Sequence, residues 1–193
     1  MTETARERIV AGAADMISRR GLNATSIREM AKHAQAPLGS TYHYFPDGKQ
    51  QLAAEAVRHT GAWVSHRLGR ELEAGPVAGL RAFLGLWREI VVNTDFHAGC
   101  PVLAVAIEEP TGDEQSPALL AAAEVFETWE ALLAESLRAH GADDERAAQV
   151  ATLIVAAVEG TVAMCRAKRS TRPLDDTAAQ LEALIRNAIS AEM

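Results

Sequence analysis

Three features of the sequence predict an all-α fold of about nine helices. Alanine, leucine and glutamate abound in the 193 residues, and these residues favour helix. β-Branched runs bounded by turn residues, which would indicate strands, are scarce. Apolar residues instead recur at helical spacing, and glycine or proline interrupts the periodic stretches. With 48% hydrophobic and 23% charged residues, the chain has the composition of an ordinary globular protein with one or two small domains.

The first three helices are expected near the N-terminus. Residues 5–20 carry apolar side chains on one face at helical spacing, and Gly21 follows as a C-terminal stop. A short second helix begins near Ser26, because Ser26 and Glu29 have the spacing of a capping box, in which each side chain satisfies a free amide. Pro37 suits the first turn of a third short helix, since the N–H that proline lacks would have no partner there.

Six further helices of varied length are expected to follow, and the sequence contains no internal repeat. They are predicted at residues 49–73, 77–94, 102–108, 117–140, 143–169 and 174–191. The breaks between them contain glycine, proline or serine and lie at Gly75-Pro76, 95–101, 110–116, Gly141 and 170–173.

Charge and hydropathy exclude several classes of protein. The net charge is −7, yet residues 1–60 hold eight Lys and Arg against six Asp and Glu, while residues 61–193 hold eleven against twenty. Such a chain can bind a polyanion only through its less acidic end. No run approaches the roughly 18 apolar residues that span a bilayer, and the first ten residues lack the pattern of a signal peptide. We therefore expect a cytoplasmic protein without membrane contact.

The cysteines and histidines do not predict a metal site. Cys100 and Cys165 lie far apart and lack C-x-x-C spacing, which argues against a disulfide framework or structural zinc. His97 and Cys100 resemble half of a metal site without the other half. We expect no metal ion and no cofactor.

Residues 25–52 carry the most chemical information. Two short helices separated by about three residues, the second rich in small, hydroxylated and aromatic side chains, indicate a helix-turn-helix whose second helix enters the DNA major groove. The alternative is a helical hairpin in which Tyr42, Tyr44 and Phe45 only pack. Gly39-Ser40-Thr41 favours DNA binding, because small residues allow close approach to a surface.

Three side chains in this stretch suit phosphate oxygens. Tyr42 and His43 end in hydrogen-bonding groups, which could position the protein on the DNA backbone. Lys49 combines a cation with the free backbone amides at the start of the next helix.

At these residues the chain resembles a known family. The chain resembles the DNA-binding signature of TetR/AcrR-family transcriptional regulators. The matching residues are Thr25-Ser26, Ile27, Ala31, Gly39-Ser40-Thr41-Tyr42-His43-Tyr44-Phe45, Lys49 and Leu52. The chain also resembles the LmrA/YxaF-type subgroup of this family, at Phe45-Pro46-Asp47-Gly48-Lys49, Gly99-Cys100-Pro101-Val102 and Arg169-Ser170-Thr171-Arg172-Pro173-Leu174. The resemblance implies a homodimeric repressor that is not an enzyme. Its recognition helices would enter major grooves about 34–36 Å apart on a palindromic double-stranded DNA operator.

The resemblance also implies which residues meet DNA. The implied contacts are Thr25, Ser26, Arg28, Leu38, Gly39, Ser40, Thr41, Tyr42, His43 and Lys49. Within the recognition helix, at about residues 38–44, Ser40 and Thr41 would lie near base edges. Ile27, Ala31, Tyr44 and Phe45 would be core. Pro37 and Leu38 depart from the family pattern, which more often has a capping Ser or Thr and then a basic residue; Leu38 could instead touch a thymine methyl.

The expected organisation has three parts. Residues 1–48 form the DNA-binding domain, residues 49–73 a linking helix, and residues 74–193 a domain that binds a small-molecule effector and forms the dimer. Candidate effector contacts are Trp63, Phe83, Trp87, Cys100, Phe126, Trp129 and Met164, which would suit a hydrophobic or aromatic molecule, although such side chains could equally be ordinary core. Candidate dimer contacts are Val150, Ile154, Val158, Thr161, Val162, Leu181, Leu184 and Ile185, which burial within one chain would also explain.

Other functions fit the sequence less well. No nucleophile motif or phosphate loop indicates an enzyme, and Glu108-Glu109 is more typical of a solvated helix face than of a catalytic carboxylate pair. A redox-responsive regulator is an alternative, since Cys100 lies in a Gly-Cys-Pro turn where a helix N-terminus could lower its pKa. A helical adaptor that does not bind DNA is another.

Overall fold

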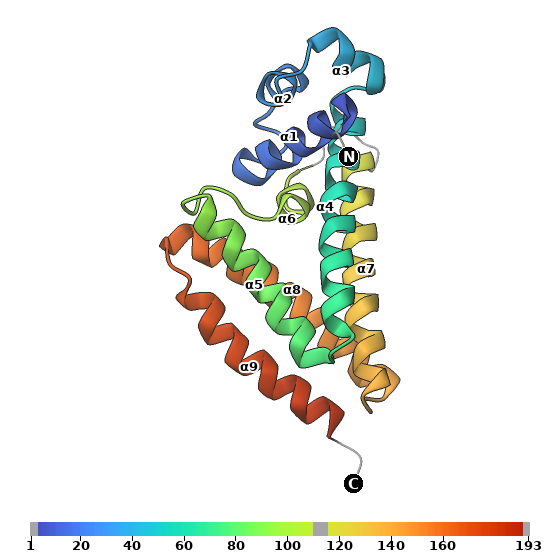
Figure 1. The fold of residues 1–193 in the computed structure, drawn as a ribbon, viewed down its shortest axis with the longest axis vertical. Coiled ribbons are helices and arrows are strands. Elements are labelled where there is room, and N and C mark those ends of the chain that lie inside the picture. The colour runs from blue at the N-terminus through green and yellow to red at the C-terminus, as the bar shows by residue number, and fades with distance from the viewer. Residues whose placement is uncertain (1–3, 110–115, 191–193) are drawn as a thin grey trace. The chain divides into compact units, whose positions relative to one another are not determined.

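The computed structural model describes residues 4–109 and 116–190, and these residues form nine helices and no strand (Figure 1). The helices are α1 (Ala5–Arg20), α2 (Ile27–His33), α3 (Leu38–Tyr44), α4 (Lys49–Leu72), α5 (Pro76–Asn93), α6 (Pro101–Ala106), α7 (Pro117–Ala139), α8 (Asp144–Lys168) and α9 (Arg172–Ile189). The all-α prediction is confirmed, and each expected helix is present to within a few residues. The loop expected at 110–116 lies, apart from Ser116, outside the described residues.

Capping boxes begin both α1 and α2. The predicted box at Ser26 is confirmed: its hydroxyl oxygen accepts from the backbone N–H of Glu29 at 3.2 Å, and the Glu29 carboxylate accepts from the backbone N–H of Ser26 at 2.9 Å. Thr4 and Glu7 form the same arrangement before α1. The hydrogen bonds from Ser26 and from Thr4 hold the pKa of Glu29 and of Glu7 below its ordinary value, because they stabilise the charged carboxylates.

The chain folds into two compact units that differ from the three expected segments. Of the described residues, the first unit comprises 4–62, 100–109 and 116–125, and the second comprises 63–99 and 126–190. Helix α4 therefore contributes to both units, as does α7. Helix α6, expected in the effector domain, belongs to the first unit with α1, α2 and α3.

The first unit is built around α1. This helix packs against α2, α3 and α6, and its inward side chains Ile9 and Ile17 are fully buried. Gly12 lies where α1 meets the end of α2, since an added Cβ would come within 2.8 Å of the Ala34 Cβ. This packing holds the two short helices that follow α1.

The second unit is built around α8, which packs against α9 and α5. Among the described helices, α8 alone is long and apolar enough to cross a membrane, by length and composition only, and half of its apolar stretch is buried in the fold. A core helix passes the same test. Ion pairs join α5 to α9. Glu182 accepts two hydrogen bonds from Arg81 at 2.7 and 2.8 Å and one from Arg186 at 3.1 Å, and Arg88 pairs with Asp175.

Candidate nucleic-acid interface

Helices α2 and α3 form the helix-turn-helix that the sequence predicts. The turn between them reverses at Gln35, whose φ of 52° lies in the left-handed region, and the N–H of Ala36 donates to the carbonyl of Ala31 at 2.9 Å. Both helices pack against α1 and against each other. The recognition helix expected at residues 38–44 corresponds to α3.

Two residues of α3 face the opposite way from the expectation. Thr41 is fully buried, with its hydroxyl donating to the carbonyl of Pro37 at 3.2 Å, so in this structure it does not lie near base edges. Tyr44 was expected in the core and is 37% exposed. The physical reason is periodicity: Thr41 lies one turn before the buried C-cap residue Phe45, so it shares the inward face of this seven-residue helix, while Tyr44 lies away from that face. Leu38, expected at DNA, is half-buried at the start of the helix.

The exposed face of α3 combines a glycine, which leaves the backbone accessible, with aromatic side chains. An added Cβ on Gly39 would meet no atom within 4 Å, so open space lies over the first turn. Tyr42 is 50% exposed, and His43 is exposed beside it with its ring edge-on to Tyr44, at 5.6 Å between centroids. Ser40 is half-buried. Two polar aromatic tips thus share a helix face with a position where the backbone is accessible.

The start of α2 contributes an exposed hydroxyl and a cation. Ser26 and Arg28 are exposed, one at the N-cap and the other in the first turn. Thr25, in contrast, is buried, and its hydroxyl donates to the carbonyl of Leu22 at 2.9 Å. Lys49 begins α4 after Gly48 and is half-buried. Lys49 contributes to lowering the pKa of Glu29, after the hydrogen bonds from Ser26, so its positive charge acts near the start of α2.

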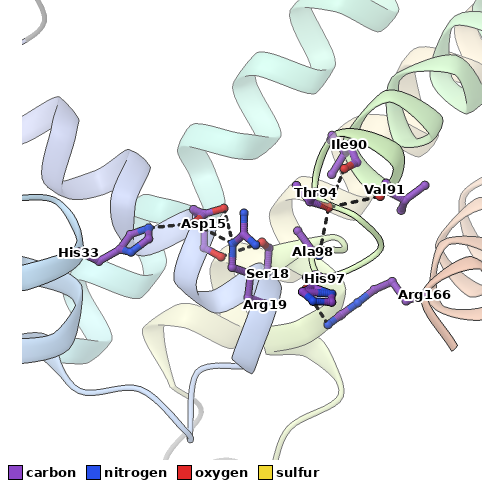
Figure 2. A network of polar contacts seen from close by, with 10 residues as sticks. All are labelled: Asp15, Ser18, Arg19, His33, Ile90, Val91, Thr94, His97, Ala98 and Arg166. Atoms are coloured by element: carbon purple, nitrogen blue, oxygen red, sulfur yellow. Dashed lines mark hydrogen bonds and ion pairs between the residues drawn. The ribbon is translucent and has the colours of Figure 1, made fainter. Parts of the chain in front are cut away.

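A polar network joins α1 to the end of α2 (Figure 2). Asp15 on α1 lies 2.8 Å from Nε2 of His33, and both its carboxylate oxygens accept from Nε of Arg19 at 2.9 Å. The Ser18 hydroxyl donates to the Asp15 carbonyl at 2.8 Å. The spacing of Asp15 and Arg19 could have indicated their pairing from the sequence, but nothing local connects Asp15 with His33.

The contacts of Arg6 were also not predicted from the sequence. Its guanidinium lies 5.4 Å from the centroid of the buried Phe45 ring, at the C-terminal end of α3, and it pairs with Glu55 on α4. Arg6 therefore connects α1, the end of the recognition helix and α4 within the first unit.

The residues expected to bind an effector fall into separate groups. Phe83, Trp87, Phe126 and Trp129 form a cluster of edge-to-face rings in the second unit, with centroids 5.6 to 6.3 Å apart. Trp63 and Met164 do not join the cluster's buried side chains, since they are 48% and 47% exposed. Met164 instead lines an open hollow of about 510 Å³ with Lys168 and Arg172. Cys100 belongs to the first unit.

Both cysteines are buried thiols. Burial raises the pKa of Cys165, because a thiolate would lose hydration there. Cys100 is the N-cap residue of α6, and its side chain is buried. In the described parts of the chain, no group of three or more His, Cys, Asp or Glu residues is placed to hold a metal ion.

Seven of the eight residues expected at a dimer contact are buried inside a single chain, and this is a correction. The seven buried residues are Val150, Ile154, Val158, Thr161, Val162, Leu181 and Ile185, and Leu184 is half-buried. A different, outward face of α8 is also apolar. It comprises Thr152, Leu153, Ala156, Gly160, Ala163, Met164 and Ala167, all exposed.

Comparisons with known proteins agree with this architecture. The family model described as "Bacterial regulatory proteins, tetR family" matches residues 9–56, and that described as "Transcriptional regulator LmrA/YxaF-like, C-terminal domain" matches residues 76–180. An uncharacterised HTH-type transcriptional regulator of Mycobacterium tuberculosis is 40% identical over 193 residues, covering 97% of this chain and 95% of that protein. YxaF of Bacillus subtilis is 33% identical, covering 94% and 95%. The crystal structure of a TetR regulatory protein from Rhodobacter sphaeroides superposes with a TM-score of 0.80 at 21% identity, over 92% of this chain and 96% of that one.

Proposed function

The chain belongs to the TetR family of bacterial transcriptional regulators, with a C-terminal domain of the LmrA/YxaF type, and on that premise we propose that it is a repressor that binds a palindromic operator as a homodimer and is released by a small hydrophobic or aromatic effector. It is not expected to catalyse a reaction. Its partners are double-stranded DNA, a second copy of the chain and the effector.

The outward face of α3 carries the proposal of operator binding. Gly39 leaves the backbone of the first turn open, while Tyr42 and His43 extend hydrogen-bonding tips on the same exposed side. A helix that packed only for structure would have no need to expose both aromatics, since each loses apolar burial by facing water. Ser26, Arg28 and Lys49 would add the contacts that position the unit on phosphate oxygens.

The exposed apolar face of α8 supports the homodimer. Leu153 is 50% exposed and lies on the same face as Ala156 and Gly160, which would allow a second helix to approach closely. A helix that is apolar on all sides needs a cover on all sides. The symmetry mate of α8 would supply that cover in a two-fold, isologous contact.

The aromatic cluster of the second unit supports a hydrophobic effector. Phe83, Trp87 and Trp129 lie within the unit that does not contain the helix-turn-helix. An effector that entered among these rings would favour one arrangement of the dimer over another. It could lower operator affinity only by the difference between its affinities for the two arrangements. Because two tryptophans lie in the cluster, their fluorescence offers a direct readout for effector screening.

Fluorescence anisotropy with DNA from upstream of the protein's own gene, beside a scrambled duplex at fixed salt, tests the operator proposal. We expect tight binding of the native duplex alone, and Tyr42→Ala should weaken it. Trp63→Ala is the control, since the Trp63 side chain is about as exposed as that of Tyr42 and is not among the proposed DNA contacts. If the native duplex is not preferred, selection from randomised duplexes decides the matter, and a selection that enriches no sequence would contradict the proposal.

A further inference from the structure

We propose that Glu108 is a positioning residue for DNA binding: its carboxylate holds the loop between α1 and α2 and so fixes the start of α2 at the DNA-facing surface. The inference rests on the proposed operator binding of this protein. It assigns a role to one member of the Glu108-Glu109 pair, which the sequence alone does not distinguish from a solvated helix face.

Two hydrogen bonds join the segment after α6 to the loop after α1. The Glu108 carboxylate accepts from the backbone N–H of Asn23 at 2.6 Å, and the Asn23 side-chain amide donates to the carbonyl of Glu109 at 3.1 Å. The first bond is short and charge-assisted, which places it among the stronger protein hydrogen bonds. The two bonds together fix both the backbone and the side chain of Asn23.

The loop packs closely against the Glu108 carboxylate at Gly21. Its φ of 81° lies in the left-handed region that favours glycine, and an added Cβ would collide with Oε1 of Glu108. Any other residue at position 21 would therefore displace the Glu108 side chain as well as strain the backbone.

The loop leads directly into the proposed phosphate-binding end of α2. Thr25 donates both its N–H, at 3.1 Å, and its hydroxyl, at 2.9 Å, to the carbonyl of Leu22, so residues 22–25 form a tight turn. Ser26 follows at once as the N-cap of α2. A displacement of Asn23 would thus be transmitted through a short, internally bonded turn to Ser26.

The surroundings of Glu108 fit a positioning role better than a direct role at DNA. Its side chain is half-buried and lines a narrow hollow of about 10 Å³ with Gln50 and Leu119, which leaves room for about one water molecule. A carboxylate in a unit that binds a polyanion opposes binding through its charge. Its contribution must therefore come from the geometry that it holds. Because Glu108 lies just after α6, this bond would also carry a movement of α6 to the loop.

The variants Glu108→Ala and Glu109→Ala provide a matched test, because they remove the same charge at adjacent positions. Only the first removes an acceptor of the Asn23 N–H, since Glu109 contributes its backbone carbonyl alone. We expect Glu108→Ala to weaken operator binding about three- to tenfold, which corresponds to the usual net contribution of one hydrogen bond. Glu109→Ala should bind as tightly as the unchanged protein or more tightly. Glu108→Gln, whose amide oxygen can still accept, should restore most of the affinity.

Two further readouts separate positioning from DNA contact and from general destabilisation. The slope of log affinity against log salt should be the same for Glu108→Ala as for the unchanged protein, because the variant removes no Lys or Arg and the displaced Ser26 carries no charge. Hydrogen exchange should speed up at the Asn23 amide in Glu108→Ala but not in Glu109→Ala, with or without DNA. If Glu108→Ala and Glu109→Ala bind the operator equally well, the positioning role is wrong. If the unchanged protein selects no DNA sequence, the proposed operator binding fails instead.

Discussion

The guanidinium of Arg166 donates a hydrogen bond from Nη2 to the backbone carbonyl of His97 at 3.1 Å, across 69 positions of sequence (Figure 2). Arg169, at the end of the same helix, pairs with Asp95 at 2.8 Å and lies 5.9 Å from the centroid of the Phe96 ring. Asp95 and Phe96 both have positive φ, 50° and 60°, which is costly for residues other than glycine. The last turn of α8 thus holds a strained loop after α5 in place.

Replacing Arg166 with alanine should loosen this loop. We expect Arg166→Ala to lower the free energy of unfolding by about 1 kcal/mol, the usual contribution of a partly exposed hydrogen bond from a charged group. Urea denaturation followed by circular dichroism measures the change. Lys168→Ala removes the same charge two residues away, from an exposed side chain, and should leave stability nearly unchanged. Equal losses in the two variants would show that the hydrogen bond to His97 contributes nothing.

A substitution at Gly39 should change DNA affinity and folding stability in opposite directions. Since an added Cβ would meet no atom within 4 Å, Gly39→Ala should stabilise α3, by up to about 1 kcal/mol, because alanine favours helix over glycine. The same methyl would stand between the helix backbone and DNA, so operator affinity should fall. Anisotropy and thermal melting on one preparation would show the two effects with opposite signs.

Gly85→Ala is the control for this prediction. Gly85 is also helical, in α5, and also has open space around its missing Cβ. It should gain stability without losing operator affinity. A Gly39→Ala variant that binds DNA as well as Gly85→Ala would remove Gly39 from the interface.

The local parts of the structure could be predicted from the sequence. The capping box at Ser26, the glycine stop at Gly21 and the boundaries of α3 each depend on a few neighbouring residues, and these predictions are confirmed. Which side of a helix faces the core was harder to predict. In α3, Thr41 and Tyr44 are both able to lie at a surface, and only the packing against α1 decides between them.

The candidate dimer residues proved to be buried within one chain for a related reason. Helix α8 is apolar nearly all the way round, so periodicity cannot distinguish the face that meets α9 from the face that stays open. Contacts between residues that are far apart in the sequence could not be predicted from any local pattern. Glu108 with Asn23 and Arg166 with His97 join positions 85 and 69 residues apart, and one member of each pair contributes only its backbone.

A charge on the open face of α8 should prevent dimer formation. Ala156 is exposed at the middle of that face, and Ala156→Glu would place a carboxylate against its own symmetry mate in the proposed dimer. We expect a monomer in sedimentation velocity, unchanged helix content, and operator affinity reduced at least about tenfold by the loss of two-site binding. Ala131→Glu, at an exposed position of α7, is the control and should stay dimeric. A dimeric Ala156→Glu variant would place the dimer contact elsewhere.

The ion-pair network at Glu182 should make stability depend on pH in the acid range. The hydrogen bonds from Arg81, and then that from Arg186, hold the pKa of Glu182 below its ordinary value of 4.5. Below that value the unfolded chain binds a proton that the folded chain does not, so the stabilisation is present above pH 4.5 and is lost as the pH falls through the folded pKa. Because the pair is partly solvated, we expect Glu182→Gln to lower the free energy of unfolding at pH 7 by less than about 1 kcal/mol.

The difference between Glu182→Gln and the unchanged protein should therefore shrink as the pH is lowered, since the unchanged side chain also becomes neutral. Urea titrations at pH 7 and at pH 3 measure it, provided that both proteins remain folded at the lower pH. Glu127→Gln, an exposed position of α7, controls for the change in net charge and should differ little from the unchanged protein at either pH. A difference for Glu182→Gln that persists undiminished at pH 3 would mean that the side chain stabilises α9 through packing, and that its charge pairing with Arg81 adds nothing.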